Sequence, residues 1–185
     1  MLIGPTCNIE GVPCGQTDVQ ARTQFSLWAL FPAPLLISQD VLRWSAYAEE
    51  TYQNTAVTAI NQDRLGRAAV RLQGGNLSFP CTDSKKTAAA STATTASCTN
   101  VWGRTLSGDR LSFVFVNNGA RAANVTCGPA CFGQLAMPAQ AYQIQDVWDL
   151  TPIPPNIQRG AAGFSHTATV PGQGGSRMFE LMAAG

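Results

Sequence analysis

From Ala68 to its end, the chain consists of short apolar runs separated by turn signals, and this pattern constrains the fold more than any other feature. Gly- and Asn-rich turns such as Ser107-Gly108-Asp109 and Asn117-Asn118-Gly119 lie between the runs. Several short strands with such turns are typical of an antiparallel sandwich. We therefore predict an all-β antiparallel sandwich over residues 69–185, with strands at 69–72, 100–104, 110–116, 142–148, 166–170 and 178–181.

The first 68 residues carry a different pattern. Ala21, Phe25 and Trp28 fall at helical spacing between Thr17, which can cap a helix, and Pro32, which ends one. We predict a helix over about 18–30.

A wholly apolar run at 33–38 predicts a strand buried on both faces. Ser45 can cap the next helix, and a further helical piece is expected at 55–61. The order helix, buried strand, helix is typical of a barrel or a doubly wound fold. Residues 1–68 are too few to close a barrel, which needs eight strand–helix units, so the pattern alone leaves both fold types open.

Composition limits the classes of partner. Charged residues make up only 12% of the chain, about half the share in ordinary soluble domains, and its net charge of +1 comes from scattered basic residues. The chain has no basic cluster typical of a nucleic-acid site and no apolar run of about 18 residues that would predict a membrane span. We expect no nucleic-acid partner and no membrane span.

The six cysteines are neighbours in pairs along the sequence. An even number of paired cysteines is typical of disulfides formed in an oxidising compartment. Zinc binding is not favoured, because the pairs lack the CxxC form and His166 is the only histidine. Many pairings are possible, and the simplest joins nearest neighbours: Cys7–Cys14, Cys81–Cys98 and Cys127–Cys131.

Two glycosylation sequons agree with secretion. They read Asn76-Leu77-Ser78 and Asn124-Val125-Thr126, which makes Asn76 and Asn124 candidate glycan carriers. The first residues contain neither the basic start nor the long apolar run of a signal peptide. We therefore expect the natural N-terminus to lie upstream of Met1, and the protein to be secreted, extracellular or lysosomal or vacuolar.

Several blocks of the chain resemble a known enzyme family. Residues 26–40 read SLWALFPAPLLISQD and residues 59–66 read AINQDRLG, and both resemble the end of the catalytic barrel of the α-galactosidases of glycoside hydrolase family 27. Residues 101–108, 127–132 and 177–181 are similar, in the family's order, to parts of its C-terminal β-sandwich. The resemblance implies an α/β barrel remnant, the last strand–helix units of a (β/α)8 TIM barrel, over 1–68 and a β-sandwich over 69–185.

The resemblance also implies what the chain does not contain. Met1 matches a methionine that directly follows a pocket-lining aspartate, so Met1 is the one residue expected to line the sugar pocket. The family's nucleophile and acid/base, both aspartates on earlier strands, have no counterpart here. A retaining glycosidase needs both carboxyl groups, about 5–5.5 Å apart, so we expect the isolated chain to be inactive. Arg64, where the family usually has proline, and the insertion at 80–98 depart from the family pattern.

Three polar residues invite a catalytic interpretation. Asp40 follows the predicted buried strand, where barrel active sites lie, but a cap or loop anchor is favoured because the family's acids lie elsewhere. Asp63 is expected to stabilise a turn. His166 has no nucleophile pattern beside it and is expected at the surface rather than as a base.

The four tryptophans could form a sugar-stacking platform. Trp28, Trp102 and Trp148 have apolar neighbours, so core packing is favoured for them. Trp44 lies between Arg43 and Ser45 and is the best candidate for an exposed aromatic residue.

The sequence is compatible with two functions. The first is the C-terminal portion of an α-galactosidase-like retaining glycoside hydrolase, acting on terminal α-galactosides without cofactor or metal, with its catalytic aspartates on an upstream segment or companion chain. α-N-acetylgalactosaminidase is a close alternative. The second is a non-catalytic structural or carbohydrate-binding glycoprotein subunit of an extracellular homo- or hetero-oligomer. In either, the apolar face formed by Leu35, Leu36, Ile37, Phe25 and Trp28 is expected to need a partner.

Overall fold

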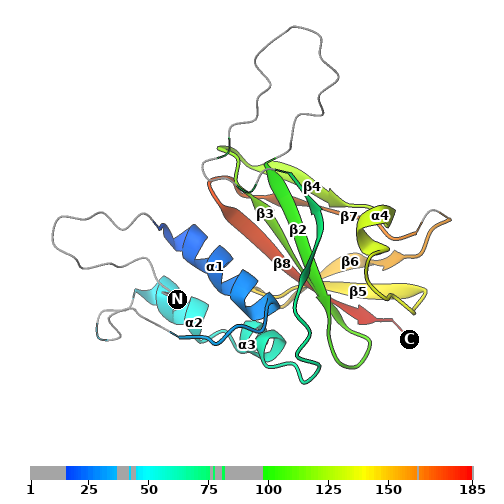
Figure 1. Ribbon diagram of the computed structural model, residues 1–185, viewed down its shortest axis with the longest axis horizontal. Coiled ribbons are helices and arrows are strands. Elements are labelled where there is room, and N and C mark those ends of the chain that lie inside the picture. The colour runs from blue at the N-terminus through cyan, green and yellow to red at the C-terminus, as the bar shows by residue number, and fades with distance from the viewer. Residues whose placement is uncertain are drawn as a thin grey trace, which may run out of the picture.

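A computed structural model describes residues 16–36, 42, 45–75, 77, 81, 98–161 and 163–184 (Figure 1). Its helices are α1 (Asp18–Leu30), α2 (Ala46–Tyr52), α3 (Thr55–Asn61) and α4 (Pro129–Phe132). Its strands are β1 (Val70–Gly74), β2 (Thr99–Thr105), β3 (Leu111–Asn117), β4 (Ala123–Cys127), β5 (Ala141–Asp146), β6 (Thr151–Gln158), β7 (His166–Val170) and β8 (Gly175–Ala183).

The described residues form three layers. A six-stranded sheet with the strand order β1-β2-β3-β8-β5-β6 lies in the middle, and its neighbouring strands are antiparallel. The helices α1, α2 and α3 cover one face of this sheet. The two-stranded sheet of β4 and β7, together with α4, covers the other face.

The central strand β3 shows why the sheet is buried on both sides. All its residues are buried, and their side chains alternate between two cores. Phe113 and Phe115 belong to the core shared with β4, β7 and α4, whereas Val114 and Val116 belong to the core shared with the helices. This alternation is the period of two that a β-strand imposes on its side chains.

Helix α1 begins where the sequence predicts. The Thr17 hydroxyl accepts the backbone N–H of Gln20 at 3.3 Å, and the Gln20 side chain accepts the N–H of Thr17 at 2.8 Å, which is a complete capping box. The predicted span of about 18–30 is confirmed. Ser45 caps α2 and the helix expected at 55–61 is α3, so these two predictions are also confirmed.

The predicted buried strand at 33–38 is wrong for its described residues, 33–36, which have no regular secondary structure. Pro34 has no N–H to donate to a sheet ladder. The segment is held instead by the side-chain amide of Asn61, which donates to the carbonyls of Trp28 at 3.2 Å and Ala33 at 2.9 Å.

The antiparallel sheet predicted from Ala68 onward is confirmed, and a sheet facing a second, smaller sheet is consistent with a sandwich. The sequence interpretation missed β4, β6 and α4. Strand β6 contains Pro152, Pro154 and Pro155 and lies at the edge of the sheet, where missing N–H donors cost little.

Helices and sheet share one core. Phe25 and Ile60 from the helices pack in the same cluster as Val114 and Met178 from the sheet. The division into 1–68 and 69–185 is still a prediction, and the structure places the irregular connection from α3 to β1 at that point. In the part of the chain that the structure describes, no helix is long and apolar enough to cross a membrane.

Candidate functional site

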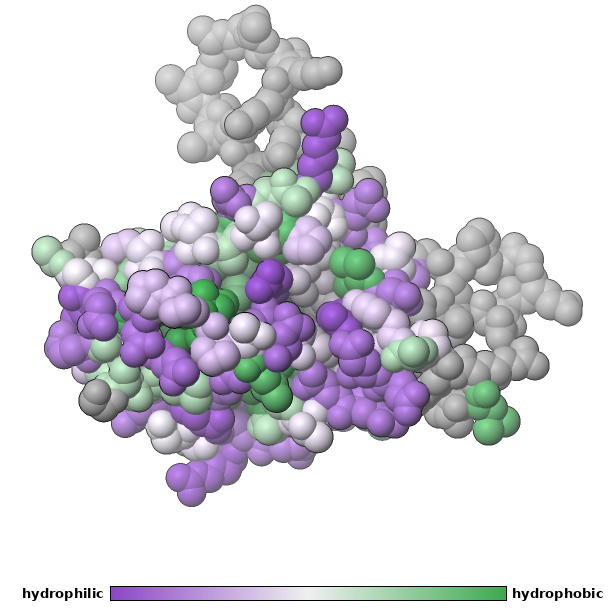
Figure 2. Space-filling model, turned by 180° about the vertical axis from the view of Figure 1, so that it is seen from behind, coloured by the Kyte–Doolittle hydropathy of each residue, from purple (hydrophilic) through white to green (hydrophobic). Residues whose placement is uncertain are grey.

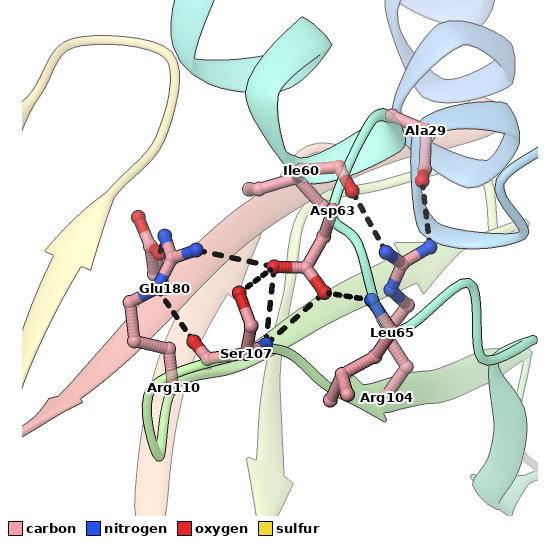
Figure 3. A network of polar contacts seen from close by, with 8 residues as sticks. All are labelled: Ala29, Ile60, Asp63, Leu65, Arg104, Ser107, Arg110 and Glu180. Carbon is pink, nitrogen blue, oxygen red and sulfur yellow. Dashed lines mark hydrogen bonds and ion pairs between the residues drawn. The ribbon is translucent and has the colours of Figure 1, made fainter.

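Asp63 lies directly after α3, at the centre of a polar network between helices and sheet (Figure 3). Its carboxylate accepts the backbone N–H of Leu65 at 3.1 Å, the N–H of Ser107 at 3.0 Å and the Ser107 hydroxyl at 2.6 Å. An ion pair of 3.2 Å joins it to Arg110. These contacts fix the turn after α3 to the β2–β3 hairpin, so the expected turn role of Asp63 is confirmed.

The surroundings of Asp63 keep its carboxylate ionised. Burial of the side chain, which is 1% exposed, acts to raise the pKa. The hydrogen bonds from Ser107 and Leu65 and the positive charge of Arg110 outweigh burial, and they hold the pKa of Asp63 below its usual value. A carboxylate held this way is a poor proton donor at neutral pH, which suits a structural role.

Arg104 of β2 is a fully buried cation on the helix-facing side of the sheet. Its guanidinium donates to the carbonyls of Ala29 at 3.4 Å and Ile60 at 2.8 Å (Figure 3), and also to the carbonyl of Leu30 at 3.1 Å. These carbonyls belong to the last turns of α1 and α3, where helices leave acceptors unsatisfied and carry partial negative charge. Burial lowers the pKa of Arg104, and the charge of Asp63 opposes that effect.

Arg110 extends the network to β8. It forms a 2.5 Å ion pair with Glu180 as well as the pair with Asp63. A hollow of about 370 Å³ beside it is lined by Arg110 but by neither of these carboxylates. The network therefore holds elements together and presents no acid/base pair to a ligand.

A second cluster joins α1, α2 and the turn after β5. The Arg22 guanidinium lies over the rings of Tyr47 at 4.2 Å and Trp148 at 4.6 Å, and it pairs with Glu50 at 2.9 Å. The Trp148 indole N–H donates to the Ser26 hydroxyl at 3.2 Å. Arg22 therefore covers one face of each of these two rings, and that face is not free to stack on a sugar.

A hollow of about 410 Å³ opens beside α1. It is lined by side-chain amides, a hydroxyl and apolar groups: Gln16, Gln20, Thr23, Gln24, Leu27, Trp28, Asn118 and Gly174. None of these lining residues has a titratable side chain. Amides donate and accept hydrogen bonds, so this hollow fits a neutral polar ligand and not proton-transfer chemistry.

The sequence-predicted site residues are not brought together. Met1, Asp40, Trp44, Asn76 and the Cys7–Cys14 pair lie outside the described residues. Cys81 is bonded to Cys98 and Cys127 to Cys131, the nearest-neighbour pairs. Asn124 is exposed on β4.

His166 is not the surface residue that was predicted. It is half-buried, and its ring lies 6.0 Å from that of Phe115 and 5.0 Å from that of Phe179. Burial, aided by the charge of Arg177, lowers the pKa of His166. The strand register, which pairs His166 with Cys127 and turns both toward the core, overrides the polarity of the imidazole.

Core packing of the tryptophans is confirmed. Trp28 is buried, and Trp102 and Trp148 are half-buried against the helix-side core. Sequence reasoning missed Arg104, although a signal was present. Along β2 and the residue that follows it, Trp102, Arg104 and Leu106 recur at the period of two on the helix-facing side, which places a cation in an apolar row.

Comparison with known proteins relates the chain to one group of enzymes. A family model described as alpha galactosidase A matches residues 9–63. The alpha-galactosidase of Coffea arabica is 30% identical over 135 residues, which covers 72% of this chain and 29% of the enzyme. Human alpha-galactosidase A is 31% identical over 135 residues, covering 65% of this chain and 26% of the enzyme.

The fold agrees with a solved enzyme of the same kind. The crystal structure of alpha-galactosidase I from Mortierella vinacea matches 99% of this chain and 38% of its own, with a TM-score of 0.70 and 18% identity. At that identity the likeness shows the fold. The chain spans less than a third of the length of both curated relatives.

Proposed function

Because the chain is related to the α-galactosidases of glycoside hydrolase family 27 and is consistent with their C-terminal portion, we propose that it is that portion of a retaining glycoside hydrolase acting on terminal α-galactosides. The observation that carries the proposal is that the comparisons together cover both the helical part and the sheets. The family model matches the helical part, residues 9–63, and the structural likeness extends over 99% of the chain, including the sheet.

The carboxylates that the structure describes support inactivity of the chain by itself. Glu50, Asp63, Asp146 and Glu180 are each paired with an arginine, and the other described carboxylates, Asp18, Glu49, Asp109 and Asp149, are exposed at the surface. A retaining mechanism needs a free carboxylate nucleophile and a second carboxyl group that donates and then accepts a proton. In the proposal, both come from an upstream segment or a companion chain, and this chain supplies the frame.

The helical layer supports a contribution to a barrel wall. We place residues 1–68 at the end of the barrel, with the irregular stretch 33–36 held against strands that precede it in the parent protein. Leu36 is 64% exposed and Phe31 is 36% exposed, so apolar surface is present at this place. Seen from the side opposite to Figure 1, the described surface is mostly polar, with apolar residues in small groups (Figure 2).

The exposed apolar surface on the helical side contains fewer residues than the sequence predicts. Phe25 is 1% exposed and Trp28 is 6% exposed, because the sheet already covers them. The segment from Phe31 to Leu36 is therefore the place proposed for contact with the rest of the barrel.

The test compares the chain alone with the chain joined to the upstream segment of its parent reading frame. Hydrolysis of p-nitrophenyl α-galactoside is expected only in the joined form. The matched control replaces the upstream nucleophilic aspartate by asparagine, which is expected to abolish turnover and leave assembly intact. Turnover by the chain alone, or none by a folded joined protein, would contradict the proposal.

One observation favours the second candidate, a carbohydrate-binding subunit. The amide-lined hollow beside α1 carries no charge and fits neutral sugar hydroxyls. Calorimetric titration of the chain alone with galactose and melibiose tests it, with Gln24→Leu as the variant. Binding that Gln24→Leu weakens would support this candidate, and no heat at millimolar sugar would oppose it.

The disulfides agree with an oxidising compartment, and we propose secretion or delivery to a lysosome or vacuole. A galactoside substrate and assembly with an upstream segment or companion chain belong to the same proposal.

A further inference from the structure

The sequon Asn124-Val125-Thr126 lies on β4, on the layer opposite to the helices. Burial along β4 alternates: Val125 and Cys127 are buried in the core, whereas Asn124 and Thr126 are exposed. The side chain of Asn124 therefore leaves the molecule from the outer face of the β4–β7 sheet.

The hydrogen bond that Asn124 makes uses its amide oxygen and not the amide nitrogen, the atom that would carry a glycan. Its amide oxygen accepts the hydroxyl of Thr169, the residue directly across the ladder, at 2.8 Å. N-glycosylation uses the other amide atom, Nδ2. A glycan on Nδ2 keeps the oxygen as an acceptor, so the contact with Thr169 survives the modification.

The outer face around Asn124 suits a first sugar. Thr126 and Thr167 place their hydroxyl oxygens 2.8 Å apart across the ladder, and with Thr169 they make the exposed neighbours of Asn124 small and hydroxylated. In the part of the chain that the structure describes, none of the ion pairs includes Asn124 or these threonines. A charged or bulky neighbour would oppose the attached sugar, and these three threonines do not.

The position also keeps a glycan away from the surface proposed for the upstream segment. The helices cover one face of the six-stranded sheet, and β4 and β7 cover the other (Figure 1). A bulky, hydrated oligosaccharide on β4 therefore projects from the side that does not carry Phe31 and Leu36.

We propose that Asn124 is an N-glycosylation site whose glycan projects from the outer face of the β4–β7 sheet. The donor is a lipid pyrophosphate-linked oligosaccharide. The Asn124 Nδ2 forms a bond to the anomeric carbon of the sugar, the bond from that carbon to the pyrophosphate oxygen breaks, the lipid pyrophosphate leaves with the electron pair, and Nδ2 loses one proton.

The test secretes the full chain behind a signal peptide from a eukaryotic host. Peptide N-glycosidase in ¹⁸O-water converts a glycosylated asparagine to ¹⁸O-labelled aspartate, which mass spectrometry locates. We expect the label at position 124 in the wild type and in Thr126→Ser, and its loss in Thr126→Ala, which removes the sequon hydroxyl.

Thr167→Ala is the matched control, because it removes the same hydroxyl contact without changing the sequon. We expect it to keep the label. A secreted chain with the Cys127–Cys131 disulfide formed and Asn124 unlabelled would overturn the proposal. That result leaves the galactosidase proposal standing, since the hydrolysis assay tests it separately.

Discussion

The two faces of the central sheet are covered by layers that are held in different ways. On the β4–β7 side, aromatic rings pack edge to face, with centroids 5.0 Å apart for Phe113 and Phe132 and 5.3 Å for Phe115 and Phe179. On the helix side, apolar packing is joined by buried hydrogen bonds from Arg104 to the ends of α1 and α3.

Because of this difference, we expect the helical layer to depend on the sheet more than the sheet depends on the helices. Helices α2 and α3 have seven residues each, well below the ~12–15 at which isolated helices become even marginally stable in water. They need the sheet, and α3 is joined to it by a directional contact, the hydrogen bond from Arg104 to the Ile60 carbonyl. The stability of the aromatic core depends on the apolar area that is buried and the volume that the rings fill, so its loss is expected to weaken both layers. Loss of one polar anchor is instead expected to release the helices first.

Phe113→Ala gives the largest expected effect. Phe113 is 1% exposed and packs against Phe132, so truncation leaves a cavity and costs about 3–5 kcal/mol of unfolding free energy. Urea unfolding measures the loss, and hydrogen exchange is expected to show faster opening of helices and sheet together. Val70→Ala, at an exposed position of β1, is the control and is expected to change stability little. If the helices stayed protected while the sheet opened, the order of dependence would be reversed.

Arg104→Met tests the helix layer. Methionine preserves much of the side-chain volume but leaves the carbonyls of Leu30 and Ile60 buried without their donor, at a cost of about 3 kcal/mol. Amide exchange in α1 and α3 is expected to accelerate more than in β3. The exposed Arg67→Met is the control. Equal acceleration in helices and sheet would remove the distinction between the two layers.

Asp63→Asn separates charge from shape in the same layer. The asparagine amide cannot accept all the hydrogen bonds that the carboxylate accepts, and it loses the ion pair with Arg110. We expect the substitution to lower the free energy of unfolding by about 2 kcal/mol at neutral pH.

The pH dependence of this effect has a defined sign. The folded pKa of Asp63 lies below the usual 3.8, so its stabilisation is complete above that value and is lost as pH falls through the folded pKa. Wild type and Asp63→Asn are therefore expected to converge in stability as the solution is acidified. A difference that stays constant down to strongly acid pH would show that the Asp63 charge contributes nothing.

The sequence predicts most strands of the central sheet, but fewer of the contacts in the polar network around Asp63 and Arg104. Short apolar runs bounded by turn signals find β3, β7 and β8. They miss β6, whose three prolines fit a strand only at an edge, and edge position is a property of topology.

Only the local contacts of the polar network are predictable from the sequence. The sequence predicts that Asp63 stabilises a turn because Asp satisfies backbone groups locally, and its contact with Leu65 is of this kind. Its contacts with Ser107 and Arg110 join residues more than 40 positions apart, and local sequence does not encode such pairs. The half-burial of His166 likewise follows from its register with Cys127.

Loss of the N-terminal cap of α1 is expected to cost less stability than any of the changes above. Thr17→Ala removes the hydroxyl that accepts the Gln20 N–H and is expected to cost about 1 kcal/mol, while Thr17→Ser keeps the acceptor and is expected to behave as wild type. Because the far end of α1 is held by Arg104, the loss should appear as faster amide exchange in the first turn only. Exchange that accelerates along the whole helix would mean that α1 opens as one unit, with its cap contributing as much to docking as its anchor does.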